Sequence, residues 1–262
     1  MKNSRAHTAA IVLAVLALIV IAMGALLTGE TRVLPGSDST AVVAPAPDLE
    51  SAHRIAGYVL AALTLGVAVL VSNPAGWIML AAAIAEALSA GIPVVHAILS
   101  PIYFSLIVVT ALLTSKSWQS PPHLVETSWP PVRIIGIHIA PFLILIQIGL
   151  GAAFRHNDMG VLSHIMNALL VLVAVLIAGI FVVRQFPGHP ALRPAALALL
   201  IITGVQVLLG FSVYLVLLMS SENNLGLVIT GVLHVANGAL TLASAAVFSM
   251  QMARNLKSQT GK

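Results

Sequence analysis

The chain has 262 residues, of which 59% are hydrophobic and only 8% are charged. Soluble domains carry about 25% charged residues, so this composition excludes an ordinary water-facing surface. The absence of cysteine excludes disulfides, thiolate metal ligands, iron–sulfur clusters and cysteine nucleophiles. The net charge of +4 is a membrane-orientation signal and not a nucleic-acid footprint, because of how the basic residues are distributed.

Apolar runs of about 20 residues recur along the chain, and each is long enough to cross the roughly 30 Å of bilayer hydrocarbon as a helix. We predict eight transmembrane helices, at residues 9–28, 53–72, 77–92, 95–115, 134–153, 161–183, 194–217 and 227–249. Asn73-Pro74 ends the second helix, and Pro93 separates the third from the fourth. The first run follows Lys2 and Arg5 as a signal peptide would, but its length and the lack of a clear small-residue cleavage site favour a retained helix.

Basic residues fall mostly on one side of this arrangement. With the N-terminus inside, nine of the twelve basic residues lie on cytoplasmic segments, and the outer segments hold only Arg32, Arg54 and Arg155. This positive-inside bias predicts a cell (inner) membrane protein with both termini in the cytoplasm. The lipid bilayer is then its first partner, and no nucleic acid is expected.

The two halves of the chain resemble each other. Gln147 and Gly151 of the fifth helix match Gln206 and Gly210 of the seventh, and Glu86 of the third helix takes the place of Gln206. We expect Glu86 to face the bundle interior and both glutamines to hydrogen-bond between helices. The repeat predicts an all-α fold of two pseudo-symmetric four-helix bundles at residues 1–120 and 133–262, joined by a cytoplasmic linker at 121–132. Both bundles begin inside, so the repeat is parallel.

Four of the nine histidines lie in the first turns of the even-numbered helices: His53, His96, His164 and His234. These helices all begin on the outer side, so the four imidazoles are expected at similar depth. Two such imidazoles in one half can bind a haem iron from opposite sides. The alternative is an interfacial, hydrogen-bonded histidine; zinc is disfavoured because each half supplies only two histidines. Four of the other histidines are expected to be solvated in termini or loops: His7, His123, His156 and His189. The remaining one, His138, lies within the fifth helix.

An acid stands beside only one of these pairs. Glu50 precedes His53 by three residues, so both side chains share a face of the starting helix. Its carboxylate can relay protons or polarise a bound oxygen species, or it can simply cap the helix. Val161 takes this place in the second half, which predicts one reactive site and one electron-transfer site. Three arginines near the helix starts are candidate partners for haem propionates, or interfacial side chains: Arg32, Arg54 and Arg155.

These residues resemble the haem A synthase family, with this chain as a cysteine-free member. The resemblance covers most of the chain. It is carried by the eight helices in two halves, by Glu50-Ser-Ala-His53-Arg54 as an E-x-x-H-R motif, by His96, His164 and His234, by Gln147-Ile-Gly-Leu-Gly151 leading to Arg155, and by Thr31-Arg32. Many members carry a cysteine pair in an outer loop, and steps that depend on those thiols cannot occur here.

The resemblance implies that His53 and His96 bind the substrate haem O and that Glu50 takes part in its oxidation. His164 and His234 would hold a haem b cofactor that passes electrons in. The C8 methyl of haem O would become a formyl group, giving haem A for a terminal oxidase. Haem O synthase and the oxidase assembly would be partners, and a homo-oligomer is compatible with this function. Two alternatives stay open: a di-haem membrane cytochrome b linked to quinone, and a transporter or assembly factor without redox chemistry.

Overall fold

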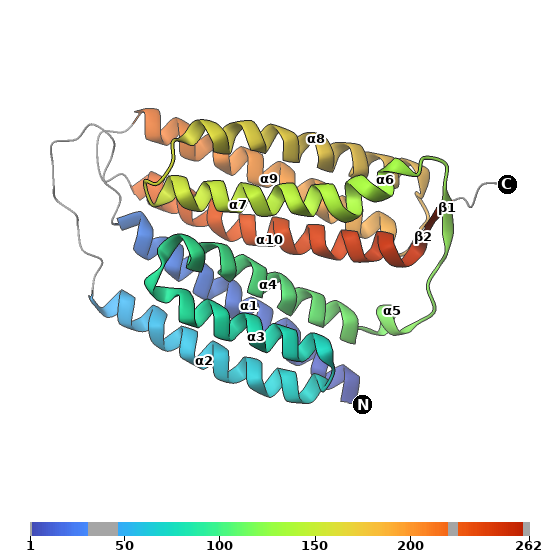
Figure 1. The fold of residues 1–262 in the computed structure, drawn as a ribbon, viewed down its shortest axis with the longest axis horizontal. Helices are drawn as coiled ribbons and strands as arrows, with labels where there is room; N and C mark the ends of the chain where they lie inside the picture. Colours follow the sequence, from blue (N-terminus) through green and yellow to red (C-terminus); the bar gives the residue numbers. More distant parts are fainter. Residues whose placement is uncertain (1, 31–46, 220–224, 259–262) are drawn as a thin grey trace.

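The computed structural model describes residues 2–30, 47–219 and 225–258. Figure 1 shows the elements in chain order: α1 (Lys2–Glu30), α2 (Pro47–Val71), α3 (Pro74–Leu88), the 3-10 turn η1 (Ser89–Gly91), α4 (Pro93–Thr114), α5 (Lys116–Gln119), β1 (Val125–Thr127), α6 (Pro131–Ile134), the π-helical turn η2 (Ile135–Ile139), α7 (Ala140–Arg155), α8 (Val161–Gln185), α9 (Leu192–Met219), α10 (Leu225–Asn255) and β2 (Leu256–Ser258). Within the described ranges, eight helical segments are long and apolar enough to cross a membrane. The prediction of an all-α, multi-pass membrane protein is confirmed.

The second and third helices meet at the predicted boundary. The side-chain oxygen of Asn73 accepts hydrogen bonds from the backbone amides of Ala75 at 2.9 Å and Gly76 at 3.3 Å. Pro74 opens α3, where a missing amide hydrogen costs nothing because first-turn amides have no helical acceptor. The turn therefore follows from local chemistry that the sequence displays.

The fifth span is interrupted by the π-helical turn η2. Pro141 has no amide hydrogen to give to the carbonyl of Ile137, four residues earlier. That carbonyl instead accepts a hydrogen bond of 2.8 Å from the hydroxyl of Ser249 on α10. A backbone group left open by proline is thus satisfied by a neighbouring helix, as an apolar surrounding requires.

The predicted linker at residues 121–132 contains a strand that the sequence analysis missed. β1 pairs in parallel with β2, with Val125 opposite Leu256. Beside this pair, the guanidinium of Arg254 lies 4.4 Å from the centre of the Trp118 ring. The last residues of α10 and β2 therefore hold the connection between α4 and α6. A strand of three residues is too short to show the alternation of apolar and polar residues that predicts a strand.

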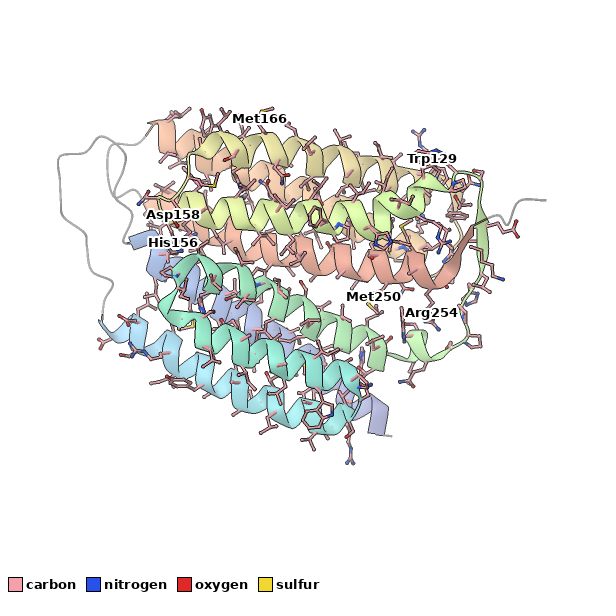
Figure 2. All side chains as sticks on the ribbon, in the orientation of Figure 1. Trp129, His156, Asp158, Met166, Met250 and Arg254 are labelled. Carbon is pink, nitrogen blue, oxygen red and sulfur yellow. The ribbon has the colours of Figure 1, made fainter. Side chains whose placement is uncertain are left out.

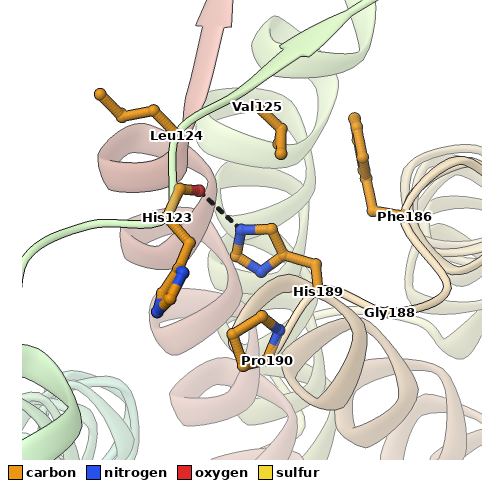
Figure 3. Close-up of a pocket in the computed structure, with 7 residues that line it drawn as sticks. All are labelled: His123, Leu124, Val125, Phe186, Gly188, His189 and Pro190. Atoms are coloured by element: carbon orange, nitrogen blue, oxygen red, sulfur yellow. Dashed lines mark hydrogen bonds between the residues drawn. The ribbon is translucent and has the colours of Figure 1, made fainter.

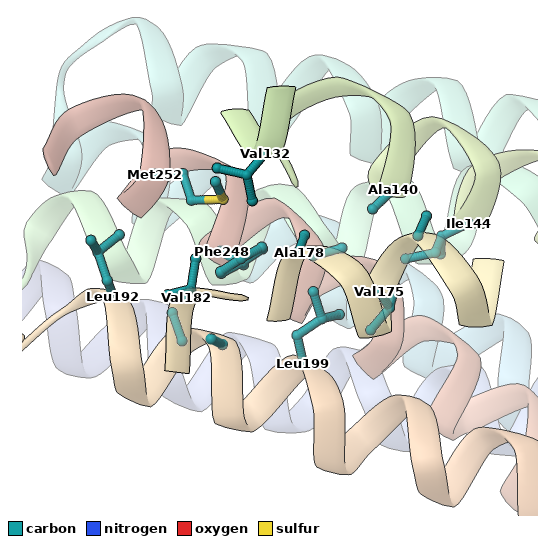
Figure 4. Packing of buried hydrophobic residues seen from close by; sticks show 14 of the residues in the cluster. Val132, Ala140, Ile144, Val175, Ala178, Val182, Leu192, Leu199, Phe248 and Met252 are labelled. Atoms are coloured by element: carbon teal, nitrogen blue, oxygen red, sulfur yellow. The ribbon is translucent and has the colours of Figure 1, made fainter. Parts of the chain in front are cut away.

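Two buried apolar clusters lie in the molecule. The first lies among α6 to α10 and includes Val175, Leu199 and Phe248 (Figure 4). The second lies among α1 to α4 and also takes Ala239 and Ala243 from α10. α10 packs against α1 and α4 as well as against α9, and its small side chains allow this close approach.

Large apolar side chains also cover the outside of the helices, as expected of a surface that faces lipid. Examples that are about half exposed are Ile11, Val15, Leu63, Leu170 and Val207. The start of α1 and the end of α10 lie on one side of the helices, together with β1 and β2 (Figure 1). We call this the terminal side. Figure 2 shows Trp129 and Arg254 on the terminal side and His156 and Asp158 on the opposite side.

Candidate functional site

The first histidine pair joins α2 and α4. His53 lies in the second turn of α2 and His96 in the first turn of α4, both at the side opposite the termini. Their ring centres are 6.3 Å apart and their planes are nearly perpendicular, at 84°. The structure therefore brings together the two histidines that the sequence pairs in the first half.

The second pair repeats this geometry between α8 and α10. The ring centres of His164 and His234 are 6.2 Å apart and the planes meet at 74°. An imidazole–metal bond is about 2.0–2.1 Å long, so two imidazoles on opposite sides of one metal have ring centres roughly 6 Å apart. Edge-to-face aromatic pairs also occur at this separation. The surroundings of the rings must therefore decide what the pairs do.

Glycines cradle three of the four rings. A Cβ atom added at Gly24, Gly151 or Gly210 would lie 2.9, 2.9 and 3.0 Å, respectively, from an imidazole Cε1. The rings in question belong to His53, His164 and His234, and each glycine lies on the helix that precedes its histidine's helix. Any larger residue would push the ring away from the neighbouring helix. The glycines set the depth of each imidazole within the bundle.

In the second half, each of the two rings is covered by a glutamine. The amide nitrogen of Gln147 lies 3.1 Å from both ring nitrogens of His164. Equal distances place that amide over the ring face, since an in-plane approach would collide with Cε1. Asn167 donates to the Gln147 side-chain oxygen at 2.8 Å and to the carbonyl of Leu143 at 3.1 Å. This network orients the amide and, through it, the imidazole.

The same network is built a second time at His234. The Gln206 amide nitrogen is 3.2 and 3.3 Å from the two ring nitrogens. Asn237 donates to the Gln206 side-chain oxygen at 2.8 Å and to the carbonyl of Ile202 at 3.0 Å. The prediction that the glutamines bond between helices is confirmed. The asparagines were missed, although a shared His-x-x-Asn spacing in α8 and α10 was visible in the sequence.

The first half replaces the amide by an acid. Oε1 of Glu86 lies 3.3 Å from Nε2 of His96, and the hydroxyl of Ser100 donates to the same oxygen at 3.0 Å. The Nδ1 of His96 is 3.1 Å from the backbone carbonyl of Glu86. A carbonyl can only accept, so Nδ1 carries the hydrogen in this bond. The expectation that Glu86 faces the bundle interior is confirmed.

His53 has no comparable partner. Its Nδ1 is buried and has no hydrogen-bond partner among the described residues. An unsatisfied buried polar atom costs about 1–3 kcal/mol, which a bound group can offset. An open ring nitrogen next to a second imidazole is one feature that fits a metal-centred ligand.

The acid and the arginines that were predicted to serve the haem sites form contacts of another kind. Glu50 forms a 2.6 Å ion pair with Arg54, and both side chains are more than half exposed. Arg155 donates a hydrogen bond to the backbone carbonyl of Ala25, linking α7 to α1. Arg32 lies outside the described residues. The carboxylate in contact with the first histidine pair is therefore that of Glu86, and Glu50 lies in the first turn of α2.

The remaining histidines differ in their surroundings. His138 is exposed on η2, and His7 is half-buried, 2.8 Å from the carbonyl of Ala111. His156 is half-buried just beyond α7, where burial, followed by the neighbouring Arg155, lowers its pKa below the usual value.

The expectation of a solvated His189 is wrong. The ring is 8% exposed, and its Nδ1 accepts from the backbone amides of Ala191 and Leu192 at 3.1 and 3.0 Å. Its Nε2 therefore donates to the carbonyl of His123 at 2.8 Å, in the shallow pocket on the terminal side shown in Figure 3. The ring of His189, in the Pro-Gly-His-Pro loop, thus bonds both to amides at the start of α9 and to a carbonyl of the linker. The sequence did not predict this double contact.

The donor set fits haem better than a bare metal ion. Among the described residues there is no group of three or more His, Cys, Asp or Glu side chains that could hold a metal. Zinc needs such a set, whereas a porphyrin supplies four equatorial nitrogens and needs only axial imidazoles. Three features support this fit. The imidazoles lie in pairs, glycines leave room for three of the four rings, and Nδ1 of His53 has no hydrogen-bond partner among the described residues. In comparisons with known proteins, no family model and no curated protein matches the chain.

Proposed function

We propose that the chain is a haem A synthase of the cell membrane, which oxidises the C8 methyl of haem O to a formyl group. The observation that carries the proposal is that two histidine pairs of equal geometry have unlike neighbours. A carboxyl group contacts the first pair, and neutral amides cover the second. Unlike neighbours suit one reactive site and one electron-transfer site.

The proposed architecture is two pseudo-symmetric four-helix bundles, formed by residues 1–120 and 133–262. The two buried apolar clusters support this division, since one lies among α6 to α10 and the other lies mainly among α1 to α4. The charge distribution supports cytoplasmic N- and C-termini, so the histidine pairs lie toward the outer leaflet. Haem O synthase and terminal oxidase assembly are the proposed partners, and a homo-oligomer is compatible with this layout.

In the first half, His53 and His96 hold the substrate haem O. Each hydroxylation of its methyl group consumes dioxygen, a pair of electrons and a pair of protons, and releases water. Glu50 is the proposed catalytic acid that relays these protons from the outer surface. Its pairing with Arg54 fixes the carboxylate at the start of α2, one turn before His53.

In the second half, His164 and His234 hold haem b, which supplies electron transfer when bound. Gln147 and Gln206 keep the two rings in place from their faces, so neither ring must reorient during turnover. Arginine forks suit propionates, and the candidates are Arg32, Arg54 and Arg155.

A di-haem membrane cytochrome b that exchanges electrons with quinone is the second candidate function. The near-identical ring separations of 6.3 and 6.2 Å favour it, because two electron-transfer sites need the same bis-histidine ligation. The carboxyl group at only one pair favours the enzyme.

Expression in a host that makes haem O but not haem A separates these functions. The haems are extracted from the purified protein and from the membranes, and then chromatographed. We expect haem A with the wild-type chain and none with His53→Ala, while His53→Ala retains haem b in the second half. Glu50→Ala is expected to lower haem A formation by at least about 100-fold, the effect of losing a general acid–base group. Haem b without conversion would support the carrier, and a colourless protein would contradict both.

A further inference from the structure

The ring nitrogen of His96 that suits iron is the one in contact with Glu86. Nδ1 donates to the Glu86 backbone carbonyl at 3.1 Å, which fixes the tautomer and leaves Nε2 as the ligating atom. Nε2 lies 3.3 Å from Oε1 of Glu86. The same residue thus prepares the imidazole through its backbone and contacts the ligating nitrogen through its side chain.

In the second half, the side chains next to the imidazoles do not approach a ring nitrogen in the way that Glu86 does. Gln147 and Gln206 occupy the equivalent places, and each amide nitrogen lies over its ring face, almost equally far from both nitrogens. Each amide oxygen is taken by an asparagine at 2.8 Å. These glutamines therefore do not donate a hydrogen bond along the lone pair of a ring nitrogen in His164 or His234.

We infer that Glu86 competes with haem iron for Nε2 of His96 and so makes the first site exchangeable. This inference rests on the proposed function, in which the first half must take up haem O and release haem A. When haem is bound, Nε2 of His96 would face the iron and the contact between Nε2 and Oε1 of Glu86 would be open. When haem leaves, that contact would close again.

Ser100 keeps the side chain of Glu86 close to His96 while haem binds and leaves. Its hydroxyl lies 3.0 Å from Oε1 of Glu86 and 2.8 Å from the carbonyl of His96, on the same helix as the imidazole. The hydroxyl holds the carboxyl group one turn from the ring after the contact opens. Glu86 therefore acts as a positioning residue for His96 and does not need to touch the reacting methyl group.

Haem transfer to excess apomyoglobin, followed by absorbance, tests the inference. Full-length chains carrying His234→Ala isolate the first site, and chains carrying His53→Ala isolate the second. In the first background, Glu86→Gln is expected to slow haem release about tenfold, as loss of a competing contact worth roughly 1.4 kcal/mol predicts. In the second background, the mirror change Gln206→Glu is expected to speed release by a similar factor. Ser100→Ala provides a third change, which slows release from the first site without altering the acid.

The outcomes separate this inference from the proposed function. A release rate unchanged by both Glu86→Gln and Ser100→Ala, in a chain that binds haem at the first site, overturns the competition and leaves the synthase proposal standing. If Glu86→Gln does not fold, an unaffected release rate in Gln206→Glu overturns it instead. A wild-type chain that binds no haem contradicts the proposed function and the inference together.

Discussion

Three glycines of this molecule face an imidazole too closely to leave room for a Cβ atom. At Gly210, an added methyl group would lie 3.0 Å from Cε1 of His234. Gly204, on the same helix, has nothing within 4 Å of an added Cβ. Alanine normally stabilises a helix relative to glycine by roughly 0.5–1 kcal/mol, so only the imidazole makes the two positions differ.

We therefore predict that Gly210→Ala displaces His234 and lowers haem b retention at the second site by several-fold. The measurement is the low-spin absorbance of the purified protein per chain. Gly204→Ala is the matched control and should retain the wild-type spectrum. Equal spectra for Gly210→Ala and Gly204→Ala would show that the glycine does not position the ring.

The pairing of the four histidines could be predicted because each lies within the first three turns of a helix that begins on the same side of the molecule. Their neighbours could not be predicted with the same certainty. The contact between Glu86 and His96 depends on how α3 and α4 are rotated against each other, and the nine residues between them do not determine that rotation. Glu50 was paired with His53 by spacing alone, whereas its side chain pairs with Arg54 at i+4.

At the scale of elements, the interrupted fifth span shows how helices share backbone hydrogen bonds. The carbonyl of Ile137 has proline at its usual helical donor position and accepts from Ser249 on α10. The hydrogen bond therefore fastens η2 to the helix that joins both halves. Interhelical hydrogen bonds in membranes average about 0.6 kcal/mol and reach about 1.7 kcal/mol.

We predict that Ser249→Ala lowers the free energy of unfolding in mixed detergent by roughly 1 kcal/mol, within that range. Pro141→Ala supplies an amide hydrogen that can reach the carbonyl of Ile137. In the Pro141→Ala background, Ser249→Ala should therefore cost less. An equal cost in both backgrounds would mean that the serine stabilises α10 by packing and not through this carbonyl.

The eight spans could be predicted because crossing hydrocarbon demands a long apolar helix, a property that each segment shows by itself. The pairing of β1 with β2 could not, because it joins a segment of three residues in the linker to a segment of three residues after α10. The burial of His189 escaped for the same reason: the carbonyl of His123, which accepts the hydrogen bond from its Nε2, lies 66 residues away.

At the scale of the whole molecule, α10 unites the two halves. It carries His234 in its early turns and contributes Ala239 and Ala243 to the cluster of α1 to α4. Arg155 adds a hydrogen bond from α7 to the carbonyl of Ala25 on α1, beside the Gly24 cradle of His53. In the proposed function, the helix that would supply His234 to the second site thus also packs against the first half.

The central claim is that one bis-histidine haem site lies in each half. Haem content per chain, with the low-spin spectrum, measures this most directly in the wild type, in His53→Ala and in His234→Ala. The account predicts two haems in the wild type, the loss of a different one in each single variant, and none in the double variant. Single variants that keep the full wild-type haem content would contradict it.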